Sequence, residues 1–247
     1  MREAGEVTLG WRDRVAVVTI DRPERRNAVD LTALQGLTDA VSTAAGGGAR
    51  ALVLTGAGGH FSAGADLTGL EDEGFAVVLR GVLELLAEVP FVTLAAVEGA
   101  ALGAGTQLAI ACDLRMATPT ARFGIPAAKL GLMVDHRTVQ RLASLSGDGP
   151  ARAMLLAAEV LDAAAAARLG LVQHLGDLDD ALAWAAEIAA LAPLTIAGHK
   201  LALGRLEPPP PADPDVDAAF TRAWRSTDLA EGRAAFRARR PPHFEGR

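Results

Sequence analysis

The 247-residue chain is 50% hydrophobic, which is enough apolar surface for one large domain or a domain with an appendage. Its formal net charge of −6 argues against a general nucleic-acid-binding surface, and no apolar run free of charge or glycine is long enough to predict a membrane span. Cys112 is the single cysteine, so an internal disulfide is excluded and a cytoplasmic location is expected.

The first half of the chain alternates apolar, strand-like runs with amphipathic helical patterns. Asp30 is placed to cap the first helix, and Pro90 ends the second. The expected strands lie within residues 7–20, which hold two, and at 51–55, 91–97 and 114–117. The expected helices cover residues 31–45 and 75–89, and a third begins at Thr106. This repeated strand–turn–helix pattern predicts an α/β fold with mostly parallel strands.

The second half of the chain is mainly helical in pattern. The expected helices cover residues 138–145, 149–158, 162–169, 179–192 and 193–206. The helix at 179–192 is apolar on nearly all sides, so we expect it to pack inside the fold or against another subunit. Four prolines at 208–211 predict a stiff spacer before a last helix at 216–239.

Two short glycine-bearing segments, residues 61–67 and 99–107, each follow an expected strand. Glycine permits positive φ angles and a close approach of the backbone to a ligand. Two such turns can aim two backbone N–H groups at one oxygen atom, which is the geometry of an oxyanion hole. The alternative is that both segments are merely tight corners between a strand and a helix.

These segments, together with several others, resemble the enoyl-CoA hydratase/isomerase (crotonase) superfamily over almost the whole chain. The matching stretches are Asp21-Arg22-Pro23, Asn27-Ala28-Val29, 61–67, 99–113, 123–126, Gln140-Arg141-Leu142, 163–172 and 239–244. The resemblance implies a spiral of ββα units with an acyl-CoA-binding core at residues 1–192. It also implies a C-terminal helical trimerisation region at residues 193–247.

The resemblance further implies a ligand, a fatty acyl-CoA or enoyl-CoA, with its thioester oxygen between the N–H groups of Ala65 and Ala104. No metal and no cofactor besides the coenzyme A thioester is expected. The positions implied to line the coenzyme A and substrate path are Arg25, Arg26, Ala28, Ala63, Asp66, Leu67 and Phe244. Three of these, Ala63, Asp66 and Leu67, are expected to act mostly through backbone atoms.

Hydration of an enoyl thioester needs an acid and a base, and hydratases of the superfamily use two glutamates for this. Here those positions match Gln107 and Ala127, neither of which can exchange a proton. Positioned acid–base groups contribute roughly 10²–10⁴-fold each, so ordinary hydratase turnover should be severely weakened. In this respect the chain resembles the superfamily members that lack both glutamates.

Asp135 matches the place where some isomerases and dehalogenases of the superfamily hold a working aspartate; the alternative is that it caps the helix near Thr138. Two functions therefore stay open. One is a protein of fatty-acid metabolism that binds acyl-CoA with weak or no hydratase activity. The other is an active enoyl-CoA hydratase, or an enoyl- or dienoyl-CoA isomerase, that uses Asp135 as its acid or base.

Four side chains in or near the two glycine segments are expected to have structural and not catalytic roles. Ser62 and Thr106 have no base nearby in the sequence and are expected to be small packing residues. Cys112 is expected to be inert in a packed small-residue helix, and Asp113 to be a structural hydrogen-bonding group.

The last expected helix displays large apolar side chains that need a surface to cover them: Phe220, Trp224, Leu229 and Phe236. The resemblance supplies such a surface in the C-terminal helices of neighbouring subunits, so a homo-trimer or a hexamer built as a dimer of trimers is expected. The alternative is that the helix folds back on its own subunit.

Overall fold

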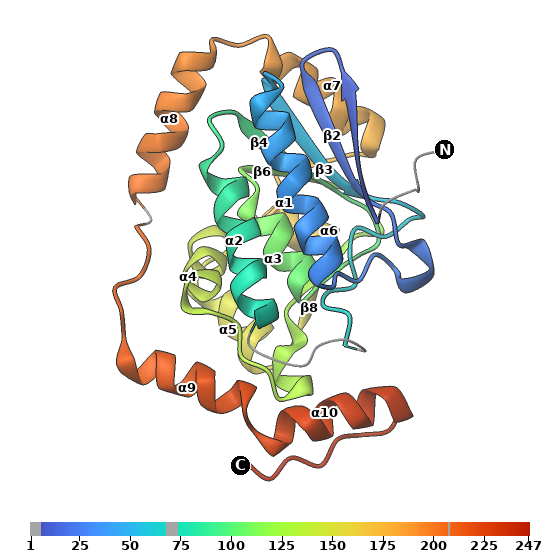
Figure 1. The fold of residues 1–247 in the computed structure, drawn as a ribbon, viewed down its shortest axis with the longest axis vertical. Helices are drawn as coiled ribbons and strands as arrows, with labels where there is room; N and C mark the ends of the chain where they lie inside the picture. The colour runs from blue at the N-terminus through green and yellow to red at the C-terminus, as the bar shows by residue number, and fades with distance from the viewer. Residues whose placement is uncertain (1–5, 68–73, 207) are drawn as a thin grey trace.

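The computed structural model describes residues 6–67, 74–206 and 208–247, and it consists of two sheets with helices packed around them (Figure 1). In the described residues the large sheet has six strands in the order β1-β2-β3-β4-β6-β9, and the small sheet has the order β5-β7-β8. The large sheet contains β1 (Val7–Arg12), β2 (Val15–Ile20), β3 (Ala51–Gly56), β4 (Val92–Val97), β6 (Leu114–Ala117) and β9 (His174–Leu175). The small sheet contains β5 (Ala100–Leu102), β7 (Arg122–Gly124) and β8 (Val160–Asp162).

The helices follow the strands in a regular order along the first two thirds of the chain. Those of the body are α1 (Leu31–Gly46), α2 (Gly74–Glu88), α3 (Ala104–Ala111), α4 (His136–Ser146), α5 (Asp148–Leu156), α6 (Ala163–Arg168) and α7 (Leu178–Ala189). The C-terminal part adds α8 (Pro193–Leu206), α9 (Pro214–Trp224) and α10 (Thr227–Ala238). Two short 3-10 helices, η1 (Pro23–Arg25) and η2 (Pro126–Leu130), each begin at a proline.

The chain winds as a spiral that passes repeatedly from the large sheet to the small one. After β3 the chain reaches Ser62, which bridges to Ala101 of β5, and after β4 it forms β5 itself. After β6 it forms β7, which pairs in parallel with β5. The strands of the large sheet from β2 to β9 are all parallel, and only β1 pairs antiparallel within it. The predicted α/β spiral of ββα units is therefore confirmed.

The large sheet is covered on both faces because its strands alternate the direction of their apolar side chains. Along β3, Leu52 and Leu54 join the main core with α1, α2 and α3, whereas Ala51 and Val53 pack with α7 on the opposite face. The α7 residues buried there are Ala181, Leu182, Ala185 and Ile188. The apolar helix expected at 179–192 thus packs inside the fold of its own chain.

Several sequence-based boundaries are wrong. The glycine segment at 99–107 contains the three-residue strand β5, and the short strands β7, β8 and β9 were not expected. The single helix expected at 216–239 is two helices, because Ser226 ends one and caps the next by accepting from the Leu229 N–H.

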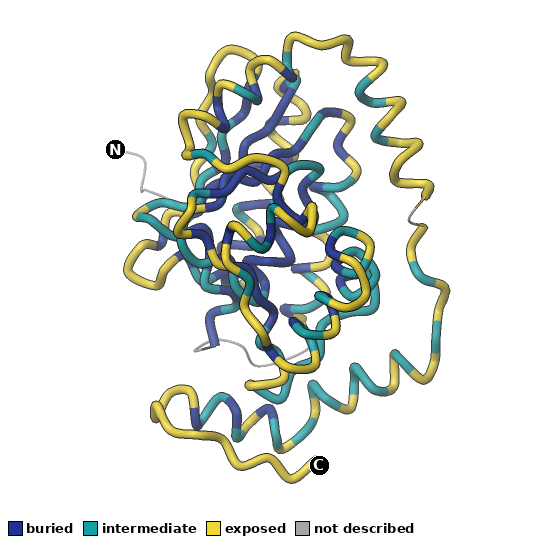
Figure 2. The backbone as a smooth tube through the Cα atoms, turned by 180° about the vertical axis from the view of Figure 1, so that it is seen from behind, coloured by how far each residue is buried: buried dark blue, intermediate teal, exposed yellow. Residues whose placement is uncertain are grey.

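Helix α8 lies at the side of the body, and most of its residues are exposed (Figure 2). Leu194 is 87% exposed and Leu206 is 78% exposed. Within the described ranges no single helix is long and apolar enough to cross a membrane; α7 and α8 reach that length only as a pair, bent by 106°.

Candidate functional site

The first glycine turn, at residues 64–66, pairs with Val29 in a way that leaves the backbone N–H of Ala65 pointing away from Val29. The Val29 N–H donates to Gly64 O (2.8 Å), and the Asp66 N–H donates to Val29 O (2.8 Å). In a parallel bridge of this kind, the N–H of the intervening residue, Ala65, points to the other side. Gly64 has a φ of 105°, a conformation that other residues rarely adopt, and its N–H donates to Ser62 Oγ (3.2 Å).

The second turn presents the beginning of helix α3. Gly103 has a φ of 54°, and its N–H donates to Gly124 O (2.8 Å), which fixes the turn against β7. Ala104 is the first residue of α3, where backbone N–H groups have no partner within the helix. The helix dipole adds partial positive charge at this end.

The two turns lie directly against each other. A Cβ atom added to Gly64 would lie 2.7 Å from Leu102 O and 3.5 Å from Ala104 N, so only glycine permits this approach. A Cβ atom added to Gly105 would lie only 2.3 Å from the carbonyl oxygen of Ser62. Among the described residues, neither the Ala65 N–H nor the Ala104 N–H has a hydrogen-bond partner. The structure thus places two unpaired donors on adjacent turns, as an oxygen-binding site requires.

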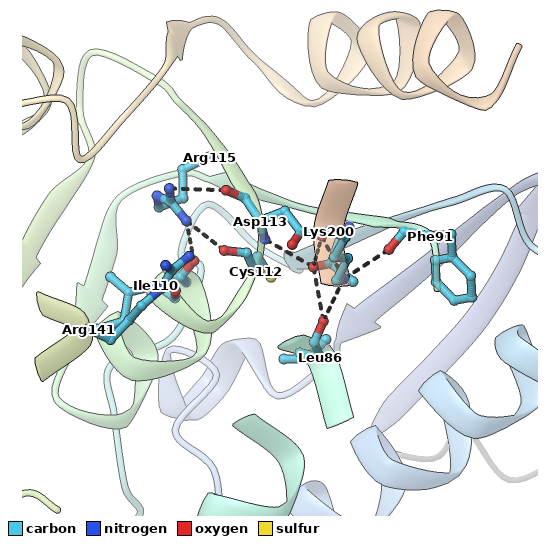
Figure 3. A network of polar contacts seen from close by, with 10 residues as sticks. Leu86, Phe91, Ile110, Cys112, Asp113, Arg115, Arg141 and Lys200 are labelled. Carbon is cyan, nitrogen blue, oxygen red and sulfur yellow. Dashed lines mark hydrogen bonds and ion pairs between the residues drawn. The ribbon is translucent and has the colours of Figure 1, made fainter. Parts of the chain in front are cut away.

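The opposite end of α3 is clamped by cations, as Figure 3 shows. Arg115 donates to Cys112 O (2.7 Å) and to Leu171 O (2.5 Å), and Arg141 Nε donates to Ile110 O (3.0 Å). Burial lowers the pKa of the Arg115 guanidinium to about 10, so it stays charged at neutral pH. Cations at a helix C-terminus complement its dipole, so α3 is fixed at one end and open at the other.

A second buried cluster lies beside the same helix end and anchors α8 (Figure 3). Lys200 Nζ donates to Asp113 Oδ2 (2.7 Å), Leu86 O (3.2 Å) and Phe91 O (3.0 Å). The Thr93 N–H also donates to Asp113 Oδ2 (2.8 Å), so the structural role expected for Asp113 is confirmed. Burial raises the pKa of the Cys112 thiol to about 12, which agrees with the expectation of an inert cysteine.

The loop at 22–30 is tied to the first turn by charge and by a buried amide. Arg25 donates to Asp66 Oδ2 (2.6 Å), and Arg22 lies 3.4 Å from the same oxygen. Asn27, in a left-handed conformation, donates to Ala57 O (2.7 Å) and His60 O (2.6 Å). The expectation that Asp66 acts mostly through its backbone is therefore incomplete, because its buried carboxylate holds the arginine loop in place.

The remaining positions expected to line the coenzyme A path surround this loop and the first turn. The Ala63 N–H donates to Arg26 O (2.9 Å), and Arg22 Nη1 donates to Ala28 O (2.5 Å). The side chain of Arg26 is exposed, and Leu67 is buried in the core. These residues lie together around the first turn, whereas contact with coenzyme A stays a prediction.

The three positions considered for acid–base catalysis are Gln107 on α3, Ala127 in η2 and Asp135 at the start of α4. Thr138 Oγ1 lies 3.0 Å from Gln107 Oε1 and 2.7 Å from Asp135 Oδ2, and it is buried. Asp135 also accepts from the Thr138 N–H (3.1 Å), so the interpretation of Asp135 as the N-cap of α4 is confirmed. Its role as an acid or base stays a prediction. Ala127, in η2, is half-buried against the main core.

A cavity of about 360 Å³ opens beside Asp135, between α2, the proline segment and α9. Its walls include Arg80, Glu84, Arg137 and Phe220, so it combines charged and apolar groups. Neither Ala65 nor Ala104 lines it. The cavity therefore adjoins the Asp135 side of the site and not the two donors themselves.

The C-terminal helices pack partly on their own chain. The Trp224 indole N–H donates to Met133 O (2.9 Å), and Gly232 lies against the Leu130 carbonyl. Leu229 is buried, whereas Phe236 is 62% exposed. Phe244, expected near coenzyme A, lies in an extended tail beyond α10, and its role stays a prediction.

Two supporting residues were missed because their contacts join distant segments. Ser62, interpreted as packing, donates to Asn27 O (2.7 Å) and accepts from Gly64 N, so it shapes the first turn. Thr106, interpreted the same way, joins α3 to β5 and β7 through Ala101 O (2.6 Å) and the Gly124 N–H (3.1 Å). The Ser62–Gly64 spacing is the one local signal that could have indicated such a turn.

The features described so far define a class of α/β proteins, a ββα spiral in which two glycine turns lie against each other at the N-terminus of one helix. A family model described as enoyl-CoA hydratase/isomerase matches residues 11–247. The chain is also 45% identical over 246 residues to "Probable enoyl-CoA hydratase echA6" of Mycobacterium tuberculosis, covering 96% of this chain and 99% of that relative. The chain belongs to the enoyl-CoA hydratase/isomerase family.

Solved structures agree with this assignment. An enoyl-CoA hydratase from Mycobacterium avium subsp. paratuberculosis superimposes with a TM-score of 0.84 at 29% identity, over 98% of this chain and 100% of that one. A methylmalonyl-CoA decarboxylase complexed with 2S-carboxypropyl-CoA superimposes with a TM-score of 0.91 over 99% of this chain and 100% of that one. Its identity is 24%, so the second likeness concerns the fold alone.

Proposed function

We propose that this chain binds fatty acyl-CoA or enoyl-CoA thioesters, with the thioester oxygen accepting hydrogen bonds from the Ala65 and Ala104 N–H groups. The observation that carries the proposal is the contact between the two glycine turns, in which neither donor has a hydrogen-bond partner among the described residues. A thioester enolate carries its negative charge on this oxygen, so the α3 dipole stabilises it. No further cofactor is needed for this binding.

We further propose that ordinary hydratase turnover is weak or absent in this chain, which would act in fatty-acid metabolism in the cytoplasm. Gln107 and Ala127 stand where the family resemblance implies two glutamates. An amide can hold a water molecule but cannot remove its proton, and a methyl group does neither. Binding and presentation of an acyl-CoA need only the oxygen site and the coenzyme A path.

One observation supports a second function, an active hydratase or isomerase that uses Asp135. The Asp135 carboxylate is joined to Gln107 through the Thr138 hydroxyl and borders the cavity between α2 and α9. Asp135 is therefore a carboxylate linked to Gln107 through a single group, the Thr138 hydroxyl. Capping of α4 occupies one of its oxygens and leaves the other directed at Thr138.

We also propose a trimer, or a dimer of trimers, with residues 193–247 as the oligomerisation region. Support comes from α8, where Leu194, Leu201, Leu203 and Leu206 are all exposed. Exposed leucines gathered on one helix are typical of a surface covered by another subunit. The contacts of Trp224 and Leu229 with their own chain leave α8 and Phe236 as the apolar surface for this assembly.

Calorimetry with decanoyl-CoA tests the binding proposal. Ala104→Pro removes one donor at the first helical position, where proline is tolerated, and should weaken binding roughly 3- to 10-fold. The matched control is Ala104→Gly, which keeps the N–H and should retain the affinity. Saturable binding by the parent protein is required; a parent protein that binds no acyl-CoA would refute the proposal.

The hydration of crotonyl-CoA tests the second part. The parent protein should be far slower than a two-glutamate hydratase, and the double variant Gln107→Glu with Ala127→Glu should be faster than the parent. Ordinary enzymatic turnover by the parent would show instead that Asp135 or another group supplies the acid–base chemistry. In that case the turnover of an Asp135→Ala variant would show whether the acid–base group is Asp135, which predicts lost activity, or another residue, which predicts retained activity.

A further inference from the structure

The hydroxyl of Thr138 lies between two groups that are both placed as acceptors. Its oxygen is 2.7 Å from Asp135 Oδ2 and 3.0 Å from Gln107 Oε1. Thr138 is 4% exposed, and a hydroxyl group carries a single hydrogen. It can therefore donate to one of these neighbours and must accept from the other.

The hydrogen belongs to the contact with Asp135. That contact is the shorter of the two, and a carboxylate is a stronger acceptor than an amide carbonyl. Asp135 is also held in place, because its Oδ1 accepts from the Thr138 N–H (3.1 Å) at the positive end of the α4 dipole. The Thr138 oxygen is then an acceptor, and the group facing it from Gln107 must be a donor.

The Gln107 side chain supplies that donor when its amide group turns by half a rotation about its last bond. This rotation exchanges O and NH₂, which have nearly the same size and position. The NH₂ group then donates to Thr138, and the carbonyl oxygen takes the other position. Among the described residues, no hydrogen bond engages the atom in that other position.

Helix geometry directs the other position toward the start of α3. Gln107 lies three residues after Ala104 on the same helix, and helical side chains lean toward the N-terminal end. An acyl group whose thioester oxygen accepts from Ala104 therefore has its first carbons within reach of Gln107.

We propose that Thr138, itself held by Asp135, is a positioning residue that turns the carbonyl oxygen of Gln107, and not its NH₂, toward the acyl ligand. The site then favours thioesters that carry a hydrogen-bond donor near the carbonyl end of the acyl chain, such as a 3-hydroxyacyl group, over those that carry only an acceptor there, such as a 3-oxoacyl group. This inference rests on the proposed binding of acyl-CoA and adds a preference among its ligands.

The test measures a ratio of two dissociation constants, for 3-oxodecanoyl-CoA, which can only accept a hydrogen bond at that position, and for the better-bound enantiomer of 3-hydroxydecanoyl-CoA, which can also donate one. The parent protein should bind the hydroxylated ligand roughly 10-fold more tightly, the effect of one additional hydrogen bond. Thr138→Val has the same shape without the hydroxyl and should bring the ratio close to one. Thr138→Ser keeps the hydroxyl and should restore the preference.

Asp135→Asn gives a sharper result because asparagine caps a helix as well as aspartate does. Its carbonyl oxygen would accept from the Thr138 N–H, so its NH₂ would donate to the Thr138 oxygen. The Thr138 hydrogen would then go to Gln107, and the Gln107 NH₂ would face the ligand. Because a ligand hydroxyl accepts as well as donates, this variant should bind 3-oxodecanoyl-CoA more tightly than the parent does and bring the ratio of the two dissociation constants close to one.

Failure of this inference is distinct from failure of the proposed function. Equal binding of 3-hydroxydecanoyl-CoA and 3-oxodecanoyl-CoA by the parent protein would overturn the inference and leave acyl-CoA binding intact. A preference that survives unchanged in both Thr138→Val and Asp135→Asn would overturn it as well. Absence of binding by these two thioesters and by decanoyl-CoA would overturn the proposed function, and the inference with it.

Discussion

The contact between the two glycine turns makes Gly64→Ala the most informative single substitution. Gly64 has a φ of 105°, and a Cβ atom there would lie 2.7 Å from Leu102 O, about 0.7 Å closer than ordinary contact allows. The backbone conformation alone costs about 1–3 kcal/mol for a non-glycine residue. Since the clashing atom is backbone, relief requires the turns to separate.

We expect Gly64→Ala to lose about 2–4 kcal/mol of stability, which lowers the melting temperature of a chain of this size by about 5–15 °C. A displacement of this size exceeds the tolerance of about 0.5 Å for a preorganised site, so affinity for decanoyl-CoA should fall by at least about 10-fold. Thermal unfolding and calorimetry on the same preparation measure both effects.

Gly81→Ala is the matched control. Gly81 lies on α2 with nothing within 4 Å of an added Cβ, so alanine there should add up to about 1 kcal/mol of stability and leave the affinity unchanged. The reasoning is refuted if Gly64→Ala binds decanoyl-CoA as tightly as the parent, because the turns would then not form the oxygen site.

Three further predictions concern the body and the assembly. Cys112 should resist alkylation at pH 8 in the folded protein and react after unfolding, and rapid alkylation of the folded protein would contradict its burial. Because folding raises the pKa of its thiol from about 9 to about 12, the free energy of unfolding should fall as pH rises through that window. Lys200→Met should cost about 2–4 kcal/mol in denaturant unfolding, because Asp113 and two carbonyls lose their shared donor, whereas the exposed Lys129→Met should stay within about 0.5 kcal/mol. Sedimentation should show a trimer or hexamer that truncation after Leu206 disrupts; a monodisperse monomer of the full chain at micromolar concentration would exclude the assembly.

The elements that carry the site were predictable because their signals are local. Gly64 and Gly103 both adopt positive φ angles after apolar strands, and Asp30 caps α1 by accepting from the Ala33 N–H, as its position before an amphipathic run predicts. Strong apolar runs likewise located β3 and β4 within two residues. In each case the residues that determine the structure lie next to one another in the chain.

The parts that were missed depend on contacts between distant segments. Strands β8 and β9 have three and two residues, and their pairing partners β7 and β6 lie more than 30 residues away, so no local pattern marks them. The Gln107–Thr138 contact crosses 31 residues, and Arg25 reaches Asp66 across 41. The break between α9 and α10 was missed because large apolar side chains lie on both sides of it, at Trp224 and Leu229, while Ser226 between them supplies a new cap.

The vibrational frequency of the bound thioester tests the central claim most directly. An infrared difference spectrum of decanoyl-CoA labelled with ¹³C at the thioester carbon isolates the one carbonyl group that should lie between Ala65 and Ala104. Two aligned donors at a helix N-terminus polarise that bond, so its stretch should move below its value in water, and Ala104→Pro should reverse part of the shift. A bound carbonyl that absorbs at or above its frequency in water would contradict the proposed oxygen site.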